Sequence, residues 1–359
     1  MLILAGGFAT RLRPLSCTRP KTLFPVLNKP LLEWIFERLA KNNFKDIILA
    51  VNRQTEIHIK QQRIPKHGLQ VTFSRDPPGK PLGTGGPIKR AENLIGNDTF
   101  MVVNGDIFAD INYAEILKLH EKSDAIATIA LHTAENPSRY GVAELTEGNR
   151  IKRFIEKPPP GTAPTNLINA GVYVLNPKVF KYIPEGRMVS FEREVFPKLV
   201  DEGKLYGYVF DGLWTDIGEP EDYLKLNRTL LNQFSNKPKY KAEGEVEVRE
   251  PVAFDKNISI GAESILGPYV VLGKNVTVGG KTCIQDSVIF PEATISDSVF
   301  INGALIGEKV SIGNNVKIGK NCVIGDHVKI KDNVQLAEGV YVCPGKEVSE
   351  SVLTSKCIF

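Results

Sequence analysis

The residues best suited to chemistry lie at the start of the chain, where a glycine pair follows an apolar run. Gly6 and Gly7 come directly after residues 2–5, which have the character of a buried strand. Without a Cβ, glycine lets backbone N–H groups approach an anion closely. Four cations follow, at Arg11, Arg13, Arg19 and Lys21. Fixed cations can hold an anion's charge as it redistributes in a reaction, so we predict an anion-binding loop. The alternative is a tight turn with solvated arginines.

Two aspartates, one directly after a predicted strand and one in a predicted turn, are candidate metal ligands. Asp106 ends an Asn-Gly-Asp sequence, and Asp216 lies in a turn bounded by glycine and proline before a predicted helix from Glu221. Mg²⁺ keeps several waters and needs one or two carboxylates besides substrate phosphates. We therefore expect Asp106 and Asp216 to hold one Mg²⁺ ion. The alternative for each is a turn or helix N-cap aspartate without a metal.

Further polar and glycine positions are suited to a sugar nucleotide. The glycine-rich turn 81–87 offers backbone that could line a base and a ribose. Glu156 and Lys157 are consecutive residues at a predicted strand end. The carboxylate could accept hydrogen bonds from sugar hydroxyls, and the ammonium could bind a phosphate. Gly141 would let the sugar approach the backbone closely, and Asn169 offers an amide that could bind sugar hydroxyls. The alternatives are an unliganded loop and a solvated ion pair.

The elements that position these residues alternate between strand and helix up to about residue 232. Three continuous apolar runs have the length of strands: 46–51, 99–103 and 125–131. Apolar residues recur at helical spacing in 31–39, 88–94 and 111–120. Such alternation predicts a mostly parallel sheet covered on both faces. Ligands of such sheets bind beyond the carboxyl ends of the strands, where the glycine pair, Asp106 and Asn169 are expected.

The second half of the chain repeats every six residues. Aliphatic residues recur from Ile260 to Ile284 and again from Ile306 to Val342, many of them followed by glycine. This period indicates short strands wound into a triangular parallel β-helix. Because the register breaks between Ile284 and Ile306, we expect an irregular coil or loop around Phe290. The polar, aperiodic segment 233–252 is predicted to be a linker between domains 1–232 and 253–359.

Taken together, the motifs resemble those of the sugar-1-phosphate nucleotidyltransferases over essentially the whole chain. In chain order they are GGFATRLRPL…RPK, LGTGGP, NGD, RYGV, FIEKP, NAGVYVL and WTDIGEPEDY. The repeats resemble the left-handed β-helix of hexapeptide-repeat proteins. The resemblance implies an α/β fold in which a Rossmann-like, mostly parallel mixed sheet is followed by a left-handed parallel β-helix.

The same resemblance implies a role for each matching residue. The implied catalytic residues are Arg11, Lys21 and Lys157, and Asp106 and Asp216 are the implied Mg²⁺ ligands. The implied nucleotide-binding residues are Leu4, Ala5, Gly6, Gly7, Arg11, Lys21, Leu82, Gly83, Thr84 and Asp106. The implied sugar-phosphate residues are Gly141, Glu156, Lys157 and Asn169. In the expected reaction, the sugar-1-phosphate oxygen displaces pyrophosphate at the α-phosphorus of a nucleoside triphosphate. That oxygen is already anionic, so no side-chain base is needed.

Within the family, LGTGGP, SRYGV and SFEREVFP are most similar to members that transfer a guanylyl group from GTP to mannose 1-phosphate. Residues 76–81 lack the acidic pair often found before LGTGGP, which leaves the base open. One alternative is glucose 1-phosphate with UTP or dTTP. A second is additional acyl transfer by the β-helix, whose one imidazole is His327. A third, a non-catalytic regulatory subunit, is disfavoured because the expected cations and carboxylates are present.

Composition narrows the class of protein. Hydrophobic residues make up 42% and charged residues 24%, as in ordinary globular proteins, and a net charge of +4 is too small to indicate nucleic acid or an anionic membrane. No apolar window approaches a membrane span, and Met1 leads directly into an apolar run, so we expect no signal peptide. The five cysteines lack metal or disulfide spacing. We expect a cytoplasmic homo-oligomer that associates through the β-helix near Phe290 and Phe300.

Overall fold

A computed structural model describes residues 1–7, 9–79, 81–234 and 239–359, which form two compact units. The first unit contains 1–7 and 32–216, and the second contains the described parts of 8–31 and 217–359. The glycine pair and the cations that follow it in the sequence therefore belong to different units. Phe8 and Lys80, which belong to two of the regions discussed above, lie outside the described residues.

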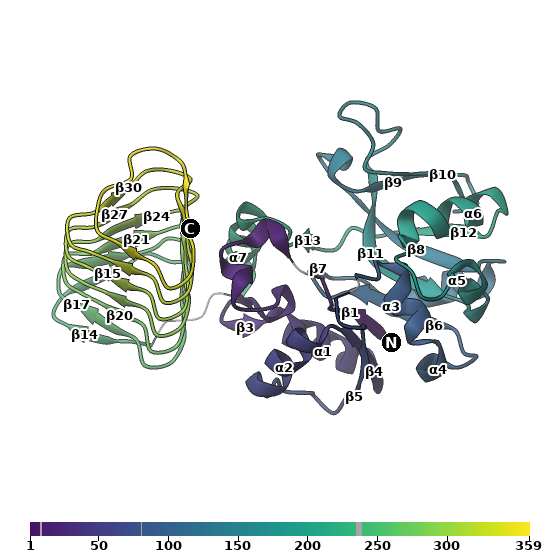
Figure 1. Ribbon diagram of the computed structural model, residues 1–359, viewed down its shortest axis with the longest axis horizontal. Helices are drawn as coiled ribbons and strands as arrows, with labels where there is room; N and C mark the ends of the chain where they lie inside the picture. The colour runs from purple at the N-terminus through teal and green to yellow at the C-terminus, as the bar shows by residue number, and fades with distance from the viewer. Residues whose placement is uncertain (8, 80, 235–238) are drawn as a thin grey trace. The chain divides into compact units, whose positions relative to one another are not determined.

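The first unit is built on a nine-stranded mixed sheet (Figure 1). Its strands are β1 (Leu2–Leu4), β4 (Asp46–Val51), β5 (Gln70–Arg75), β6 (Phe100–Asn104), β8 (Ala127–Thr133), β9 (Gly141–Leu145), β10 (Ile151–Glu156), β11 (Leu167–Leu175) and β12 (Leu205–Val209). Strands β6, β1, β4 and β5 are neighbours in that order and parallel. Strand β11 runs antiparallel to β6, β8 and β9, so the sheet is mixed, with a larger antiparallel part than expected.

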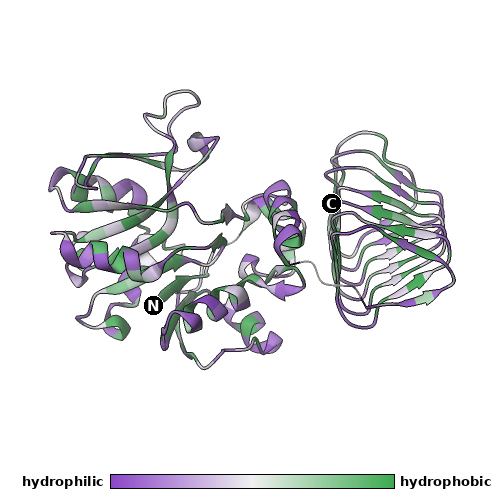
Figure 2. Cartoon of the chain, turned by 180° about the vertical axis from the view of Figure 1, so that it is seen from behind, coloured by the Kyte–Doolittle hydropathy of each residue, from purple (hydrophilic) through white to green (hydrophobic). Residues whose placement is uncertain are grey.

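Amphipathic helices follow the strands of this unit. They are α1 (Leu31–Lys41), α2 (Arg53–Gln62), α3 (Gly85–Arg90), α4 (Glu92–Ile95), α5 (Tyr113–Lys122) and α6 (Phe196–Asp201). The helices expected near 31–39 and 111–120 are confirmed, whereas the one expected at 88–94 divides at Ala91 into α3 and α4. Apolar colouring marks the central strands in Figure 2, where Leu2, Ile3 and Val102 are fully buried. Within the described chain, no helix has the length and apolar character to cross a membrane.

The second unit contains three parallel sheets that form the predicted triangular β-helix, consistent with left-handed winding. The first sheet holds β14 (Lys241–Glu243), β17 (Ser259–Gly261), β20 (Thr277–Val278), β23 (Thr294–Ile295), β26 (Ser311–Ile312), β29 (Lys329–Ile330) and β32 (Glu347–Val348). The second holds β15 (Val246–Val248), β18 (Ser264–Leu266), β21 (Cys283–Gln285), β24 (Phe300–Asn302), β27 (Lys317–Ile318) and β30 (Gln335–Leu336). The third holds β16 (Val252–Phe254), β19 (Val270–Leu272), β22 (Val288–Ile289), β25 (Leu305–Ile306), β28 (Val323–Ile324), β31 (Tyr341–Val342) and β33 (Cys357–Ile358).

Shorter elements complete both units. The first unit also has the antiparallel pair β7 (Ile107–Ala109) and β13 (Trp214–Asp216), and the second has β2 (Pro25–Val26), β3 (Lys29–Pro30) and α7 (Pro220–Phe234). Short helical segments lie at Thr10–Leu12, Leu15–Cys17, Lys21–Leu23, Pro137–Arg139, Pro177–Tyr182 and Phe191–Val195.

The prediction of an irregular coil or loop near Phe290 is wrong. Strands β22, β23 and β24 continue all three sheets, and the register break is absorbed by two five-residue sides instead of six-residue ones, from Ile284 to Ile289 and from Ile301 to Ile306. A shorter side removes one corner residue without opening the ladder of hydrogen bonds. The side chain of Phe290 is fully buried, so it cannot contribute to a surface for self-association.

Strands β14, β15 and β16 lie within or across the end of the segment predicted as linker, 233–252, of which 235–238 fall outside the described residues. Each of these strands pairs in register with the strand of the next coil. The polar side chains at this first coil hid its strand character, because its residues face solvent more than those of later coils. The division into domains 1–232 and 253–359 stays a prediction.

The β-helix core generates a stability prediction. Ile318 is fully buried in the stack of aliphatic side chains, and replacing it with alanine should leave a cavity that costs about 2–5 kcal/mol. We expect a lower urea midpoint for the second unit in Ile318→Ala. The neighbouring exposed residue supplies the control, since Lys317→Ala should change stability by less than about 0.5 kcal/mol. Equal midpoints for the two variants would contradict the assignment of the core.

Candidate active site

The glycine pair ends β1 at the carboxyl edge of the parallel strands. The carbonyl oxygen of Gly6 accepts a hydrogen bond from Nδ2 of Asn52 at 2.9 Å, and Asn52 also caps α2. The N–H of Gly105 donates to the carbonyl of Leu4 at 2.8 Å, which joins the Asn-Gly-Asp turn to the same edge. A Cβ added to Gly7 would meet no atom within 4 Å among the described residues beyond its chain neighbours. The backbone at Gly7 is therefore open to a ligand.

Asp76 is a candidate site residue that our sequence analysis missed. It follows β5 directly, and its Oδ2 lies 2.9 Å from where a Cβ on Gly6 would stand. Its Oδ1 is buried without a hydrogen-bond partner among the described residues. Burial raises the pKa of Asp76 to about 6, against the opposing charge of Arg90. A buried carboxylate oxygen beside the glycine turn is suited to accept hydrogen bonds from a ligand. An acidic residue directly after the strand was the available sequence signal.

The two candidate metal ligands are brought together by the pairing of β7 with β13. In this antiparallel ladder Asp216 is opposite Ile107, the residue that follows Asp106. Opposite Cα atoms in such a ladder lie about 4.5–5.5 Å apart. The two aspartates therefore occupy adjacent positions, although they are far apart in the sequence.

Neither aspartate serves as a helix N-cap. The cap of α5 is Asn112, whose Oδ1 accepts hydrogen bonds from the N–H groups of Ala114 and Glu115. Helix α7 begins at Pro220, well beyond Asp216. The N-cap role considered for each aspartate is thus wrong, whereas Asp106 does lie in a turn, and metal binding by the two aspartates stays a prediction.

The strand that carries Asp216 also connects to the predicted sugar-binding residues. Nε1 of Trp214 donates to the carbonyl of Ala170 at 2.9 Å, within the Asn-Ala-Gly segment. The rings of Trp214 and Tyr140 pack edge to face with centroids 5.2 Å apart. The carbonyl of Tyr140 in turn accepts the N–H of Lys157 at 3.0 Å. One chain of contacts therefore runs from the aspartate pair to Lys157.

Gly141 and Glu156 face one another across the β9–β10 ladder. A Cβ on Gly141 would lie 2.7 Å from Oε2 of Glu156, so only glycine leaves that carboxylate in place. Burial raises the pKa of Glu156, and the nearby Glu192 adds to the effect. Asn169 accepts the N–H of Gly171 through Oδ1 and donates from Nδ2 to the Tyr173 hydroxyl, at 2.9 and 3.1 Å.

Glu192 is a second residue that the sequence analysis missed, and it anchors the second glycine-rich turn. Its Oε2 accepts the Thr84 hydroxyl at 2.6 Å, and the Thr84 oxygen accepts the N–H of Phe191 at 2.9 Å. The carbonyl of Leu82 accepts the N–H of Val189 at 3.0 Å. Leu82, Gly83 and Thr84 are thereby fixed against the segment 189–192. The motif SFEREVFP contains Glu192, but the motif alone does not show that Glu192 binds Thr84.

Arg11 and Lys21 lie in the second unit, so the first unit alone brings together only part of the predicted site. The guanidinium of Arg11 lies 3.3 Å from a carboxylate oxygen of Glu219, and both side chains are about half exposed. Lys21 is 8% exposed and begins a helical turn. Arg19, which we grouped with the anion-binding cations, is buried in ion pairs with Glu308 and Asp326.

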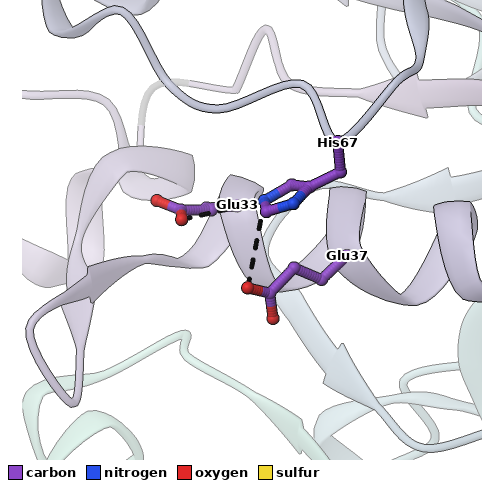
Figure 3. A group of neighbouring side chains, drawn as sticks. All are labelled: Glu33, Glu37 and His67. Atoms are coloured by element: carbon purple, nitrogen blue, oxygen red, sulfur yellow. Dashed lines mark ion pairs between the residues drawn. The ribbon is translucent and has the colours of Figure 1, made fainter.

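A separate group of titratable side chains consists of two glutamates of α1 and His67, which lies between α2 and β5. Nε2 of His67 is 3.8 Å from Oε1 of Glu33 and 3.9 Å from Oε1 of Glu37 (Figure 3). The two glutamates are one helical turn apart, so a protonated His67 would tether its loop to the helix.

The raised pKa of Asp76 generates a stability prediction. Between about pH 4 and pH 6 the unfolded chain loses this proton while the folded chain keeps it, so folding stability falls as pH rises through that window. Asn cannot ionise, and Asp76→Asn should therefore gain in Tm relative to the wild type from pH 4 to pH 6 and keep that gain above it. Asp98→Asn, at an exposed position, is the control. A Tm difference that stays constant with pH would contradict the assignment.

Comparisons with known proteins show the family of the chain. Residues 1–233 match the nucleotidyl transferase family model, and residues 248–358 match the GMPPB C-terminal domain. A mannose-1-phosphate guanyltransferase of Yarrowia lipolytica is 40% identical over 264 residues, covering 72% of this chain and 70% of the relative. That of Saccharomyces cerevisiae is 38% identical over 250 residues, with 68% of each covered.

Solved structures share the fold over about two thirds of the chain. HddC from Yersinia pseudotuberculosis, complexed with GMP-PN, has a TM-score of 0.55 at 30% identity and covers 64% of this chain and 98% of its own. A putative glucose-1-phosphate thymidylyltransferase from Bacillus anthracis has a TM-score of 0.57 at 23% identity, covers 66% and 96%, and supports the fold alone. With motifs, geometry and family model in agreement, the chain belongs to the nucleotidyl transferase family and is a nucleotidyltransferase.

Proposed function

We propose that this enzyme makes GDP-mannose by transferring the guanylyl group of GTP to mannose 1-phosphate, with release of pyrophosphate. The names of the relatives and the match to the GMPPB C-terminal domain support this substrate pair. The observation that carries the chemistry is the β7–β13 register, which makes Asp106 and Asp216 neighbours.

The aspartate pair fits a divalent cation. Two aspartates at adjacent backbone positions offer a hard oxygen donor set, which suits Mg²⁺ when substrate phosphates and water complete the shell. When bound, Mg²⁺ supplies positive charge to the α-phosphate oxygens, where negative charge develops. Asp106 and Asp216 hold it there in our proposal.

The remaining roles belong to positioning groups. Backbone N–H groups at Gly6 and Gly7 receive the triphosphate, and Lys157 orients the phosphate of the attacking sugar. Arg11 and Lys21 stabilise the departing pyrophosphate. Because the attacking oxygen is already anionic, the reaction needs alignment and charge stabilisation but no side-chain base. Burial lowers the pKa of His120 to about 4, which excludes that imidazole as a charged participant near neutral pH.

Asp76 supplies a basis for the choice of guanine. The Watson–Crick edge of guanine presents two adjacent donors, N1–H and the N2 amino group, and a carboxylate can accept both. In our proposal Oδ1 of Asp76 accepts them, since it lies beside the glycine turn and has no hydrogen-bond partner among the described residues. Uracil and thymine offer one donor flanked by carbonyls, so a carboxylate there repels them.

Self-association through the β-helix stays part of the proposal. Phe300 is 39% exposed and Leu353 is 72% exposed, so both offer apolar surface that Phe290 does not.

The metal assignment predicts the effect of neutralising Asp106. Asp106→Asn should lower turnover by about 10²- to 10³-fold, as expected for loss of one charge-stabilising group, with the far-UV spectrum unchanged. Asp110→Asn, at an exposed aspartate next to β7, is the control and should retain turnover.

The assay is pyrophosphate release with Mg²⁺ and GTP, UTP, dTTP or ATP, each with mannose and glucose 1-phosphates. Preference for UTP or dTTP with glucose 1-phosphate would contradict the proposed substrate pair.

The base assignment predicts a pH dependence. Only the ionised Asp76 accepts both guanine donors, so the KM for GTP should rise as pH falls below about 6. In Asp76→Asn the KM for GTP should be higher by about tenfold or more near neutral pH and should lose this pH dependence. A variant with the wild-type KM and pH profile would contradict the role of Asp76 in selecting the base.

A further inference from the structure

Arg19, in the loop between the glycine pair and Lys21, is held by two carboxylates of the β-helix within the second unit. Its Nη2 lies 2.7 Å from Oε2 of Glu308 and 2.9 Å from Oδ2 of Asp326. The hydroxyl of the preceding residue, Thr18, donates to the same Oδ2 at 2.6 Å. Three polar contacts therefore join this loop to the β-helix, two of them to Asp326 and one to Glu308.

These charges are buried. The Arg19 side chain is 9% exposed and that of Asp326 only 3%, whereas that of Glu308 is 29% exposed and also lies 3.5 Å from Nζ of Lys309. Burial alone lowers the pKa of Arg19, but the two carboxylates outweigh it and raise that pKa overall. Removing one partner of a buried pair leaves an uncompensated charge and disturbs the structure strongly. Asp326 is thus the principal partner.

Apolar packing supports the same contact. The guanidinium of Arg19 lies 4.9 Å from the ring centroid of Phe290, the aromatic residue that a five-residue side of the β-helix buries. Phe24 packs edge to face on Phe290 and on Tyr223 of α7, with centroids 6.2 and 5.7 Å apart. Nδ2 of Asn28 donates to the carbonyl of Leu272 at 3.0 Å. The segment 18–28 therefore contacts the β-helix at both of its ends and at Phe24.

Asp326 also has an ordinary role in the repeat, which a sister residue shares. Its Oδ1 accepts the N–H of Glu308 at 2.7 Å, one coil earlier. Asp332 does the same for the N–H of Asn314, also at 2.7 Å. Asp332 is exposed, however, whereas Asp326 is 2% exposed. The two aspartates differ in what their second oxygen contacts, which makes Asp332 a matched control.

The clamped residue is directly connected to a proposed phosphate ligand. Only Pro20 separates Arg19 from Lys21, and its φ of −63° is fixed by the ring. Lys21 then begins a helical turn in which its carbonyl accepts the N–H of Phe24 at 3.1 Å. Fixing Arg19 therefore fixes the path of the backbone into Lys21.

We propose that Asp326, assisted by Glu308, is a positioning residue for the transfer reaction, because it clamps Arg19 and thereby sets the place of Lys21 in the nucleotide-phosphate loop. The β-helix then has a part in nucleotide binding besides any role in assembly. The kinetic part of this inference rests on the proposed function, whereas the clamp itself does not.

The first test measures the loop directly. The N–H groups of Leu12, Cys17 and Leu23 donate only to nearby loop carbonyls, so their hydrogen exchange reports how well the loop is held. Asp326→Asn keeps an oxygen for the Glu308 N–H but loses the charge that holds Arg19. Exchange in residues 9–24 should accelerate in Asp326→Asn and stay at the wild-type rate in Asp332→Asn. Equal exchange in the two variants would overturn the clamp.

The second test separates positioning from general damage. In Asp326→Asn we expect the KM for GTP to rise about tenfold or more, with the KM for mannose 1-phosphate within about twofold of the wild type, because misplacing a ligand by a fraction of an ångström is costly. Asp332→Asn should match the wild type in both. If Asp326→Asn fails to fold, Thr18→Val removes one contact from the loop side and should change the same two quantities less, in the same direction. An unchanged KM for GTP in a folded variant overturns the positioning role.

The rival explanation is that Arg19 itself binds phosphate. Arg19→Gln and Asp326→Asn should then lower kcat/KM independently, and the double variant should show the product of the two effects. The clamp predicts instead that the double variant is no worse than the poorer single one. Should the wild type transfer no guanylyl group to mannose 1-phosphate, the proposed function fails, and the exchange measurement still decides the clamp.

Discussion

The pairing of β7 with β13 is the interaction on which the account of the site depends. It places Asp216 beside Asp106, and the same strand carries Trp214, which contacts both the Asn-Ala-Gly segment and Tyr140. The parallel strands bring the glycine turn to this edge, and the antiparallel strands bring Glu156 and Lys157. A two-stranded ladder thus connects the part of the sheet proposed to bind nucleotide with the part proposed to bind sugar.

The β-helix shows how a repetitive scaffold acquires a specific contact. A corner aspartate such as Asp332 accepts one backbone N–H from the preceding coil, and its side chain is otherwise exposed. At Asp326 the second carboxylate oxygen is occupied by Thr18 and Arg19, which lie 308 and 307 positions away in the sequence. Desolvating these charges is costly, and the shared hydrogen bonds and the ring of Phe290 offset the cost.

Much of the fold was predictable because local patterns encode it. Continuous apolar runs predicted the central strands, the six-residue period predicted the β-helix, and Gly6 and Gly7 marked the turn at the strand edge. Other features depend on partners distant in the sequence. Nothing local distinguishes Asp326 from Asp332, or shows that Oδ1 of Asp76 is buried with no partner in the described part of the chain. The five-residue sides that end at Ile289 and Ile306 looked like a break in the repeat, because the sequence shows only the changed spacing. The strand pairing that keeps the ladder in register is visible only in the structure.

The central claim, that Asp106 and Asp216 share one divalent ion, is tested most directly by Mn²⁺ binding. Electron paramagnetic resonance of the wild type with a non-hydrolysable GTP analogue should show one tightly bound Mn²⁺ per chain. Asp106→Asn and Asp216→Asn should each weaken its affinity by about tenfold or more, since each removes one of two carboxylate ligands. Wild-type affinity in either variant would contradict the shared site.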